Sequence, residues 1–394
     1  MSRRIIVMLT ISAWTGLAAA QSGVDPSEAP LWQTAVASRG LPALHDDTVF
    51  VLSADHEVVA LARDDGRILW RRSTGERGWT TEGSRVVVAG DTVIAGDWDL
   101  FAYDVRTGVP RWTFRPVTGY APGYFLGVAS GSRVFTGSPS GRLYAVESTT
   151  GRQLWQTPVA PVTDGGPLAS VYAPVSNGRL VVAGYTIYSA QASGGVVAVD
   201  AASGRELWRF PFPVPTDSLR SIYYAGGPVL TDDLAIAAGG DGQVWGLDLA
   251  SGRVRWSIPP LSGPIDGIIT VTDQEQRALA VVGTQLLVGS LTGYLTAYDL
   301  ATQREVWQLR QGSLGSLSWH DLTHADGVVY VPFVSGFLHA VDAGTGAVLW
   351  QTRDFRRGLS WPVLVSGDRL FAASASGVWA LPAARPQAPR EPAR

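Results

Sequence analysis

Short apolar runs separated by glycine-containing links recur along the chain, and no long stretch has the spacing of an amphipathic helix. The runs 328–334 and 337–343, for example, flank the link Ser335-Gly336. Apolar runs of this length around small turn residues are typical of β-hairpins. The same kind of link occurs at Ser140-Gly141, Asp241-Gly242, Thr292-Gly293 and Ser376-Gly377. The pattern therefore predicts an all-β protein made of many short antiparallel strands.

One motif, A-x-D-x-x-[ST]-G-x-x-x-W, is repeated in seven segments that align without gaps. The copies are 60–70, 102–112, 145–155, 198–208, 246–256, 297–307 and 340–350. Consecutive tryptophans are 38 to 53 residues apart, which is room for four short strands and their turns. This period predicts a β-propeller of four-stranded antiparallel blades.

Each position of the motif has a physical reason. The small first residue suits a place where neighbouring sheets approach closely, and the aspartate accepts hydrogen bonds from backbone N–H groups of a tight turn. Glycine adopts a left-handed turn conformation at no steric cost, and the broad tryptophan ring can fill the gap between adjacent blades. Three copies depart from the pattern, with Ala62 and Glu147 replacing the aspartate and Gln303 replacing the glycine.

The two ends of the repeat region carry complementary parts of an eighth unit. Segment 378–381 begins the motif and stops before its turn, whereas 30–34 matches the strands around Trp155 and Trp350. We expect the N-terminal strand to complete the last blade and close an eight-bladed ring without a free edge. The predicted propeller spans residues 31–382, with the docking tryptophans Trp32, Trp70, Trp112, Trp155, Trp208, Trp256, Trp307 and Trp350.

Residues 1–20 have the composition of a secretory signal peptide. Arg3 and Arg4 precede the mostly apolar stretch 5–17, and small residues provide a cleavage site near Ala20. The general secretory route fits better than the twin-arginine route. The expected location is therefore the periplasm or the extracellular medium.

The remaining segments outside the ring are a predicted linker, 21–30, and a Pro/Arg-rich tail, 383–394, that we expect to be disordered. No later apolar run is long enough to span a membrane. The absence of cysteine excludes disulfides and a lipidated N-terminal cysteine. We thus expect a monomeric propeller with neither a transmembrane segment nor a lipid anchor.

Charge and residue content exclude several functions. The net charge is −3 and all 31 basic residues are arginines scattered along the chain, so there is no electrostatic footprint for nucleic acid. The sequence has no nucleophile elbow and no phosphate-binding loop. It also has no pair of carboxylates that we would assign as a general acid and base. His320 and His324 share a strand face but have no evident third ligand nearby. We therefore predict no catalytic residues and no metal site.

The repeated motif resembles that of the pyrroloquinoline-quinone (PQQ)-like propeller family. One branch of that family, the quinoprotein dehydrogenases, binds PQQ and Ca²⁺; the resemblance implies longer chains with an adjacent cysteine pair and an asparagine at the calcium site. This chain has no cysteine, and its one asparagine, Asn177, lies in a predicted β-turn. The other branch is non-catalytic and is exemplified by the BamB propeller of the outer-membrane β-barrel assembly machinery.

The segment Ser218-Leu219-Arg220 resembles a Leu-Arg loop with which the assembly-machinery propellers contact their barrel-forming partner. The resemblance implies a non-enzymatic scaffold that binds a protein partner and no cofactor. A generic polar loop between blades is the alternative for these three residues. For the whole chain, the alternatives are a PQQ- and Ca²⁺-dependent dehydrogenase and a propeller that binds polysaccharide or cell-wall fragments.

Aromatic residues recur just before the innermost strand of many blades. In a propeller this position lies at the rim of the central funnel, where a ring of aromatics could bind a peptide, a sugar or a flat cofactor. Capping of the blade cores explains the same pattern equally well. The candidate rim residues are Trp79, Tyr120, Tyr124, Tyr172, Tyr223, Tyr224, Trp319, His320 and Trp361.

Overall fold

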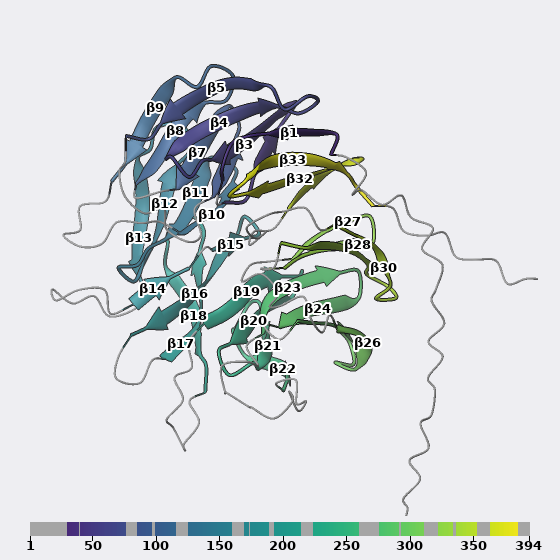
Figure 1. The fold of residues 1–394 in the computed structure, drawn as a ribbon. Helices are drawn as coiled ribbons and strands as arrows, with labels where there is room; N and C mark the ends of the chain where they lie inside the picture. Colours follow the sequence, from purple (N-terminus) through teal and green to yellow (C-terminus); the bar gives the residue numbers. More distant parts are fainter. Residues whose placement is uncertain are drawn as a thin grey trace, which may run out of the picture.

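The computed structural model is an eight-bladed β-propeller of antiparallel sheets (Figure 1). The predicted fold is confirmed, and no helix occurs among the described residues. No helix there is long and apolar enough to cross a membrane. The structure describes residues 30–38, 40–75, 85–96, 99–115, 125–159, 169–172, 174–188, 193–213, 224–259, 276–290, 293–310, 322–333, 336–352 and 363–384.

Each of the first four blades runs from an inner to an outer strand in chain order. Blade 1 contains β2 (Ala43–His45), β3 (Thr48–Leu52), β4 (Glu57–Ala62) and β5 (Ile68–Ser73). Blade 2 contains β6 (Val86–Ala89), β7 (Thr92–Gly96), β8 (Leu100–Asp104) and β9 (Pro110–Phe114). Blade 3 contains β10 (Phe125–Ser130), β11 (Arg133–Gly137), β12 (Arg142–Glu147) and β13 (Gln153–Pro158). Blade 4 contains β14 (Ala169–Val171), β15 (Val175–Ser176), β16 (Leu180–Ile187), β17 (Ser193–Asp200) and β18 (Glu206–Pro211).

The last four blades follow the same order, except that blade 8 takes its outer strand from the N-terminal side. Blade 5 contains β19 (Tyr224–Leu230), β20 (Leu234–Gly239), β21 (Val244–Asp248) and β22 (Val254–Ile258). Blade 6 contains β23 (Gln276–Val282), β24 (Gln285–Ser290), β25 (Tyr294–Asp299) and β26 (Glu305–Arg310). Blade 7 contains β27 (Thr323–Ala325), β28 (Val328–Pro332), β29 (Leu338–Asp342) and β30 (Val348–Thr352). Blade 8 contains β31 (Leu364–Ser366), β32 (Arg369–Ser374), β33 (Gly377–Pro382) and β1 (Trp32–Thr34).

The ring closes through β1, which pairs with β33 at the opposite end of the chain (Figure 1, purple beside yellow). Trp32 lies opposite Ala380, the same register in which Trp70 lies opposite Ala60 in blade 1. The backbone N–H groups of Leu31 and Ser38 donate to the carbonyls of Ala380 and Ser374, at 2.8 and 2.9 Å. The closing strand thus occupies the outer position that each other blade fills from its own repeat.

The hydrophobic core is divided among the interfaces between blades. Each pair of neighbouring blades shares one cluster of buried apolar side chains, for example Phe371, Val378 and Trp32 of blade 8 with Val49 and Val59 of blade 1. A single blade has two apolar faces and cannot bury them alone, so stacking around a closed ring buries all of them.

Antiparallel connections give the ring two different faces. In blades 1 to 7 the hairpin between strands one and two lies at the same edge as the turn between strands three and four. A backbone bond joins these two connections, as in Val105 N to Asp91 O, 3.1 Å, and Leu249 N to Asp233 O, 2.9 Å. We call this side the turn face and the opposite side, where outer strands end and the next inner strands begin, the loop face.

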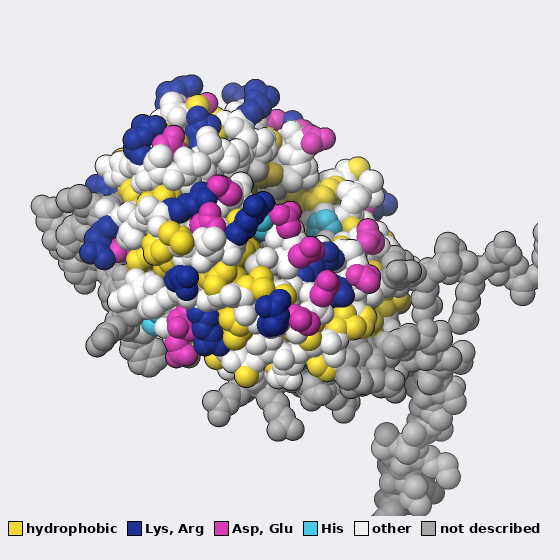
Figure 2. All heavy atoms as spheres, turned by 90° about the horizontal axis from the view of Figure 1, so that it is seen from above, with side chains coloured by type: hydrophobic (Ala, Val, Ile, Leu, Met, Phe, Trp, Pro, Cys, Tyr) yellow, Lys and Arg dark blue, Asp and Glu magenta, His cyan; other side chains and the backbone are white. Residues whose placement is uncertain are grey.

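The charged surface is mixed rather than divided by sign. Figure 2 shows one side of the molecule, on which arginine side chains lie among aspartates and glutamates with apolar patches between them. Several of these charges form ion pairs, including Arg71 with Glu57 and Arg111 with Asp91.

Candidate functional site

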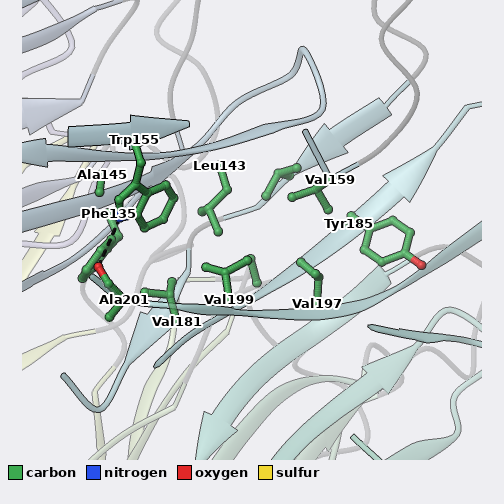
Figure 3. Close-up of a cluster of buried hydrophobic side chains, with 12 residues drawn as sticks. Phe135, Leu143, Ala145, Trp155, Val159, Val181, Tyr185, Val197, Val199 and Ala201 are labelled. Carbon is green, nitrogen blue, oxygen red and sulfur yellow. Dashed lines mark hydrogen bonds between the residues drawn. The ribbon is translucent and has the colours of Figure 1, made fainter. Parts of the chain in front are cut away.

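Six docking tryptophans donate the indole N–H to a backbone carbonyl of the next blade. In Figure 3, Trp155 of blade 3 reaches Ala201 of blade 4 at 3.2 Å, beside Phe135 and Val181. We call this contact the inter-blade indole bond. The other pairs are Trp32–Arg63, Trp70–Val105, Trp112–Ser148, Trp208–Leu249 and Trp307–Ala343.

The glycine of the motif is required for two reasons at once. Gly204 has a φ of +71°, as expected for a left-handed turn residue. In addition, a β-carbon at Gly204 would lie only 2.6 Å from the ring of Trp155, which covers the turn from the preceding blade. The motif glycine is therefore also needed because the tryptophan of the preceding blade packs directly against it.

Blade 6 departs from this arrangement because Gln303 stands at the glycine position. Gln303 has a φ of +57°, and its Nε2 donates to the Leu300 carbonyl at 2.6 Å, the acceptor that Trp256 of blade 5 would otherwise use. The Trp256 ring lies instead against its own blade, where a β-carbon on Gly246 would be 2.2 Å from it. Gly246, where most repeats have alanine, makes room for the displaced ring.

Trp350 is the second docking tryptophan without an inter-blade indole bond among the described residues. Blade 8 has no motif turn to receive it, and Trp350 packs at 6.1 Å from the ring of Tyr330. The Tyr330 hydroxyl accepts the backbone N–H of Ala384 at 2.8 Å. The end of blade 8 is thus fixed by a tyrosine instead of a turn.

The repeated acidic residues are engaged in their own turns. Asp200 accepts the backbone N–H and the hydroxyl of Ser203, at 2.8 and 2.6 Å, and these bonds lower the pKa of its carboxyl. The guanidinium of Arg255 and the bonds from Ser251 lower the pKa of Asp248 to about 2. Such carboxylates stay ionised and are unsuited to general acid–base catalysis near neutral pH.

Two blades carry an arginine immediately before the docking tryptophan. Arg111 joins the hairpin residue Asp91 and the turn residue Asp104, both at 2.7 Å. Arg255 joins Asp233, at 2.6 Å, and Asp248 in the same way. Each arginine therefore fills the space between the hairpin and the turn of its own blade.

A cleft of about 650 Å³ opens between blades 4 and 5 on the turn face. Leu207, at the position that arginine occupies in blades 2 and 5, lines the cleft and is 40% exposed. Asp200 and Arg179 line the side of blade 4, and Asp232 and Arg255 the side of blade 5. Sequence reasoning did not identify this cleft, although the leucine before Trp208 is visible in the alignment of the repeats.

Most of the predicted partner and rim residues lie outside the described residues and stay predictions. Tyr224 begins β19, and only the backbone of this residue is described. Tyr172 is half-buried, packs against the core between blades 4 and 5, and its hydroxyl lies 3.3 Å from Thr186 Oγ1. The predicted residues outside the described part are Trp79, Tyr120, Tyr124, Ser218, Leu219, Arg220, Tyr223, Trp319, His320 and Trp361.

The described residues do not fit the calcium site that a quinoprotein would need. The Asn177 Oδ1 accepts the backbone N–H groups of Arg179 and Leu180, each at 3.1 Å, within a turn. In the described part of the chain no three His, Asp or Glu side chains are grouped so that they could hold a metal ion. A hard cation such as Ca²⁺ requires several converging oxygen ligands.

Comparison with known proteins identifies relatives of two kinds. The outer membrane protein assembly factor BamB of Yersinia pestis is 25% identical over 229 residues, 56% of this chain and 54% of the relative. The quinohemoprotein alcohol dehydrogenase ADH IIB of Pseudomonas putida is 25% identical over 205 residues, 50% of this chain and 29% of the dehydrogenase. The crystal structure of BamB from Moraxella catarrhalis superposes with a TM-score of 0.63 at 20% identity, covering 86% of this chain and 92% of that one.

These likenesses carry different weight. The chain spans about half the length of the Yersinia relative that it matches, and the structural likeness at 20% identity concerns the fold alone. The profile of one family, described as outer membrane protein assembly factor BamB, matches residues 22–172 and 162–316, which is well over half of the chain. This chain, with its eight blades of PQQ-like repeats, therefore belongs to the BamB family of propellers.

Proposed function

We propose that this protein is an exported, non-enzymatic scaffold that binds a protein partner in the assembly of outer-membrane proteins. The observation that carries the proposal is the family match over residues 22–316. The repeated turn carboxylates support it, since residues such as Asp200 and Asp248 are hydrogen-bonded within their own turns. The partner contact would involve Ser218, Leu219 and Arg220, between β18 and β19.

Site-specific crosslinking in cells tests the proposal. A photo-crosslinking residue at Arg220 should capture an outer-membrane assembly protein. The same residue at Val109, which is exposed in a turn of blade 2, is the control and should not capture it. Equal capture at both positions, or no specific capture at Arg220, would contradict the proposed contact.

A PQQ-dependent dehydrogenase is the second candidate because a quinohemoprotein alcohol dehydrogenase is among the relatives. The turn role of Asn177 argues against it. Titration of the purified protein with PQQ and Ca²⁺, followed by the quinone absorption spectrum, distinguishes the two functions. The scaffold proposal expects no spectral change at micromolar PQQ, and saturable binding would favour the dehydrogenase.

A further inference from the structure

We propose that the cleft between blades 4 and 5 binds a basic side chain, arginine or lysine, presented by a loop of a partner protein. The cleft lies on the turn face, whereas the end of β18 and the start of β19, which flank the Ser218–Arg220 segment, lie on the loop face. The inference does not depend on the proposed partner contact.

The walls of the cleft are regular parts of the fold. Its two sides are the strand-one-to-two hairpins of blades 4 and 5, which contribute Arg179 and Asp232, and the motif turns, which contribute Asp200 and Asp248. Backbone bonds from Ala201 N to Arg179 O and from Leu249 N to Asp233 O hold each hairpin to its turn. The volume of about 650 Å³ is within the range of small-ligand sites.

The residue before the docking tryptophan differs between the two blades that line the cleft. In blade 5 this residue is Arg255, which pairs with both Asp233 and Asp248 of its own blade. In blade 4 it is Leu207, whose apolar side chain cannot form a polar bond to Asp200. The cleft therefore has an exposed aliphatic surface beside Asp200 and Asp232, two carboxylates without a salt bridge among the described residues.

The balance of charge favours a cationic occupant. Four aspartates and two arginines line the cleft, and Arg255 is already paired with two of the aspartates. Asp200 forms hydrogen bonds to Ser203 but no salt bridge, and Asp232 has no polar partner among the described residues. A carboxylate of this kind binds a guanidinium or ammonium group through short, charge-assisted hydrogen bonds.

The aliphatic surface favours a basic side chain over a free cation. Arginine and lysine have apolar stems that can pack on Leu207 and Ala250 while the charged head reaches Asp232. A metal ion would need converging ligands, and the carboxylates of the cleft form no such group in the described residues.

Peptide binding to the full chain tests this inference. The probe is a fluorescent, end-capped peptide of sequence Gly-Leu-Arg-Leu-Gly, and the matched peptide has neutral citrulline in place of arginine. Fluorescence anisotropy should show binding of the arginine peptide that weakens with added salt and is at least about tenfold tighter than that of the citrulline peptide.

Two variants locate the binding. Asp232→Asn should weaken binding of the arginine peptide about tenfold, because it removes the free carboxylate. Leu207→Arg should abolish binding, since the new side chain can bond Asp200 and fill the cleft from within. The matched control is Val306→Arg, which makes the same kind of change at the same motif position of blade 6, where Val306 is 48% exposed.

The inference is overturned if no arginine peptide binds, if the citrulline peptide binds equally well, or if Leu207→Arg retains binding. Loss of binding in Val306→Arg would also overturn it, because a general effect of added positive charge would then explain the result. Unchanged thermal unfolding of each variant shows that the fold is intact, and crosslinking at Arg220 is unaffected by either outcome.

Discussion

Single residues decide how each blade is joined to the next. In the regular blades, the tryptophan of the preceding blade packs against the motif glycine. A β-carbon added at Gly204, for example, would lie 2.6 Å from the Trp155 ring. In blade 6, Gln303 replaces the glycine, and Gly246 of blade 5 accommodates the displaced Trp256. Gln303 and Gly246, which are far apart in sequence, are therefore parts of one structural adjustment.

This adjustment predicts that Gly246→Ala alone destabilises the protein. The added methyl would lie 2.2 Å from the Trp256 ring, and such overpacking costs about 1–3 kcal/mol. The double variant with Gln303→Gly should recover part of the loss, because Trp256 could then dock on blade 6. Urea unfolding of both single variants and the double variant measures the coupling, expected to exceed about 0.5 kcal/mol. Strict additivity would contradict the explanation.

A buried histidine predicts acid sensitivity. His339 is fully buried against Phe333, with 4.8 Å between ring centroids, and among the described residues neither ring nitrogen has a hydrogen-bond partner. Burial lowers its pKa to about 4. Below pH 6.5 the unfolded chain binds this proton more readily than the folded chain, so stability falls as the pH drops from 6.5 towards 4, by about 3 kcal/mol.

His339→Leu should remove most of that pH dependence when the free energy of unfolding is measured between pH 7.5 and 4.5. The control is His324→Leu, which changes an exposed histidine of the same blade and should leave the dependence unchanged. The carboxylates with lowered pKa values, such as Asp200 and Asp248, titrate at lower pH. If both variants retain the full dependence, burial of His339 is not its cause.

The sequence predicts a residue's structural role correctly where that role depends on contacts within one repeat. A left-handed glycine in a turn and an aspartate that accepts turn N–H groups follow from the backbone within one repeat, and Gly204 and Asp200 behave in this way. The role of Gly246 could not be predicted, since it depends on Gln303 in the next blade. The cleft could not be predicted for the same reason. It depends on two blades together, since it is lined by Leu207 of blade 4 and by Asp232 of blade 5, which has no polar partner among the described residues.

At the scale of elements, the closing strand is the feature with the largest consequence. β1 supplies the fourth strand of blade 8 and part of the cluster between blades 8 and 1. Arg369 strengthens the same junction, with its guanidinium 2.8 Å from the Arg63 carbonyl and 3.0 Å from the Asp64 carboxylate. The matching tryptophan segments at 30–34 and 349–352 were sufficient to predict this pairing from sequence.

A chain that begins at residue 39 should therefore expose the edge of β33 and associate through it. Light scattering after size exclusion should show dimers or larger species, and a synthetic peptide of residues 30–38 should restore the monomer. The same peptide with Trp32→Ala is the control and should bind at least about tenfold more weakly. A truncated chain that stays monomeric and equally stable would show that closure is not needed.

At the scale of the whole molecule, the inter-blade indole bonds are unevenly distributed. Among the described residues, Trp256 on β22 and Trp350 on β30 lack this bond, whereas Trp155 on β13 and Trp208 on β18 have it. Because each blade contacts only its neighbours, local opening should begin where a contact is missing.

Hydrogen exchange under native conditions should consequently be faster in β22 and β30 than in β13 and β18. Mass spectrometry of peptides that cover these strands provides the measurement. Gln303→Gly should slow exchange in β22 and leave β30 unchanged, which separates the effect of the indole bond from that of strand position. Equal protection of all four strands would contradict the link between the bond and local stability.

The ring closure also determines when, during synthesis of the chain, the propeller can be completed. A ribosome makes β1 before any blade and β33 after all the others, yet these two strands are partners. During almost all of synthesis β1 has no partner strand. Every partial chain therefore exposes two strand edges with unpaired backbone N–H and C=O groups. Closure can follow only the appearance of the last strand, so a chain interrupted anywhere before residue 377 cannot form the intact ring.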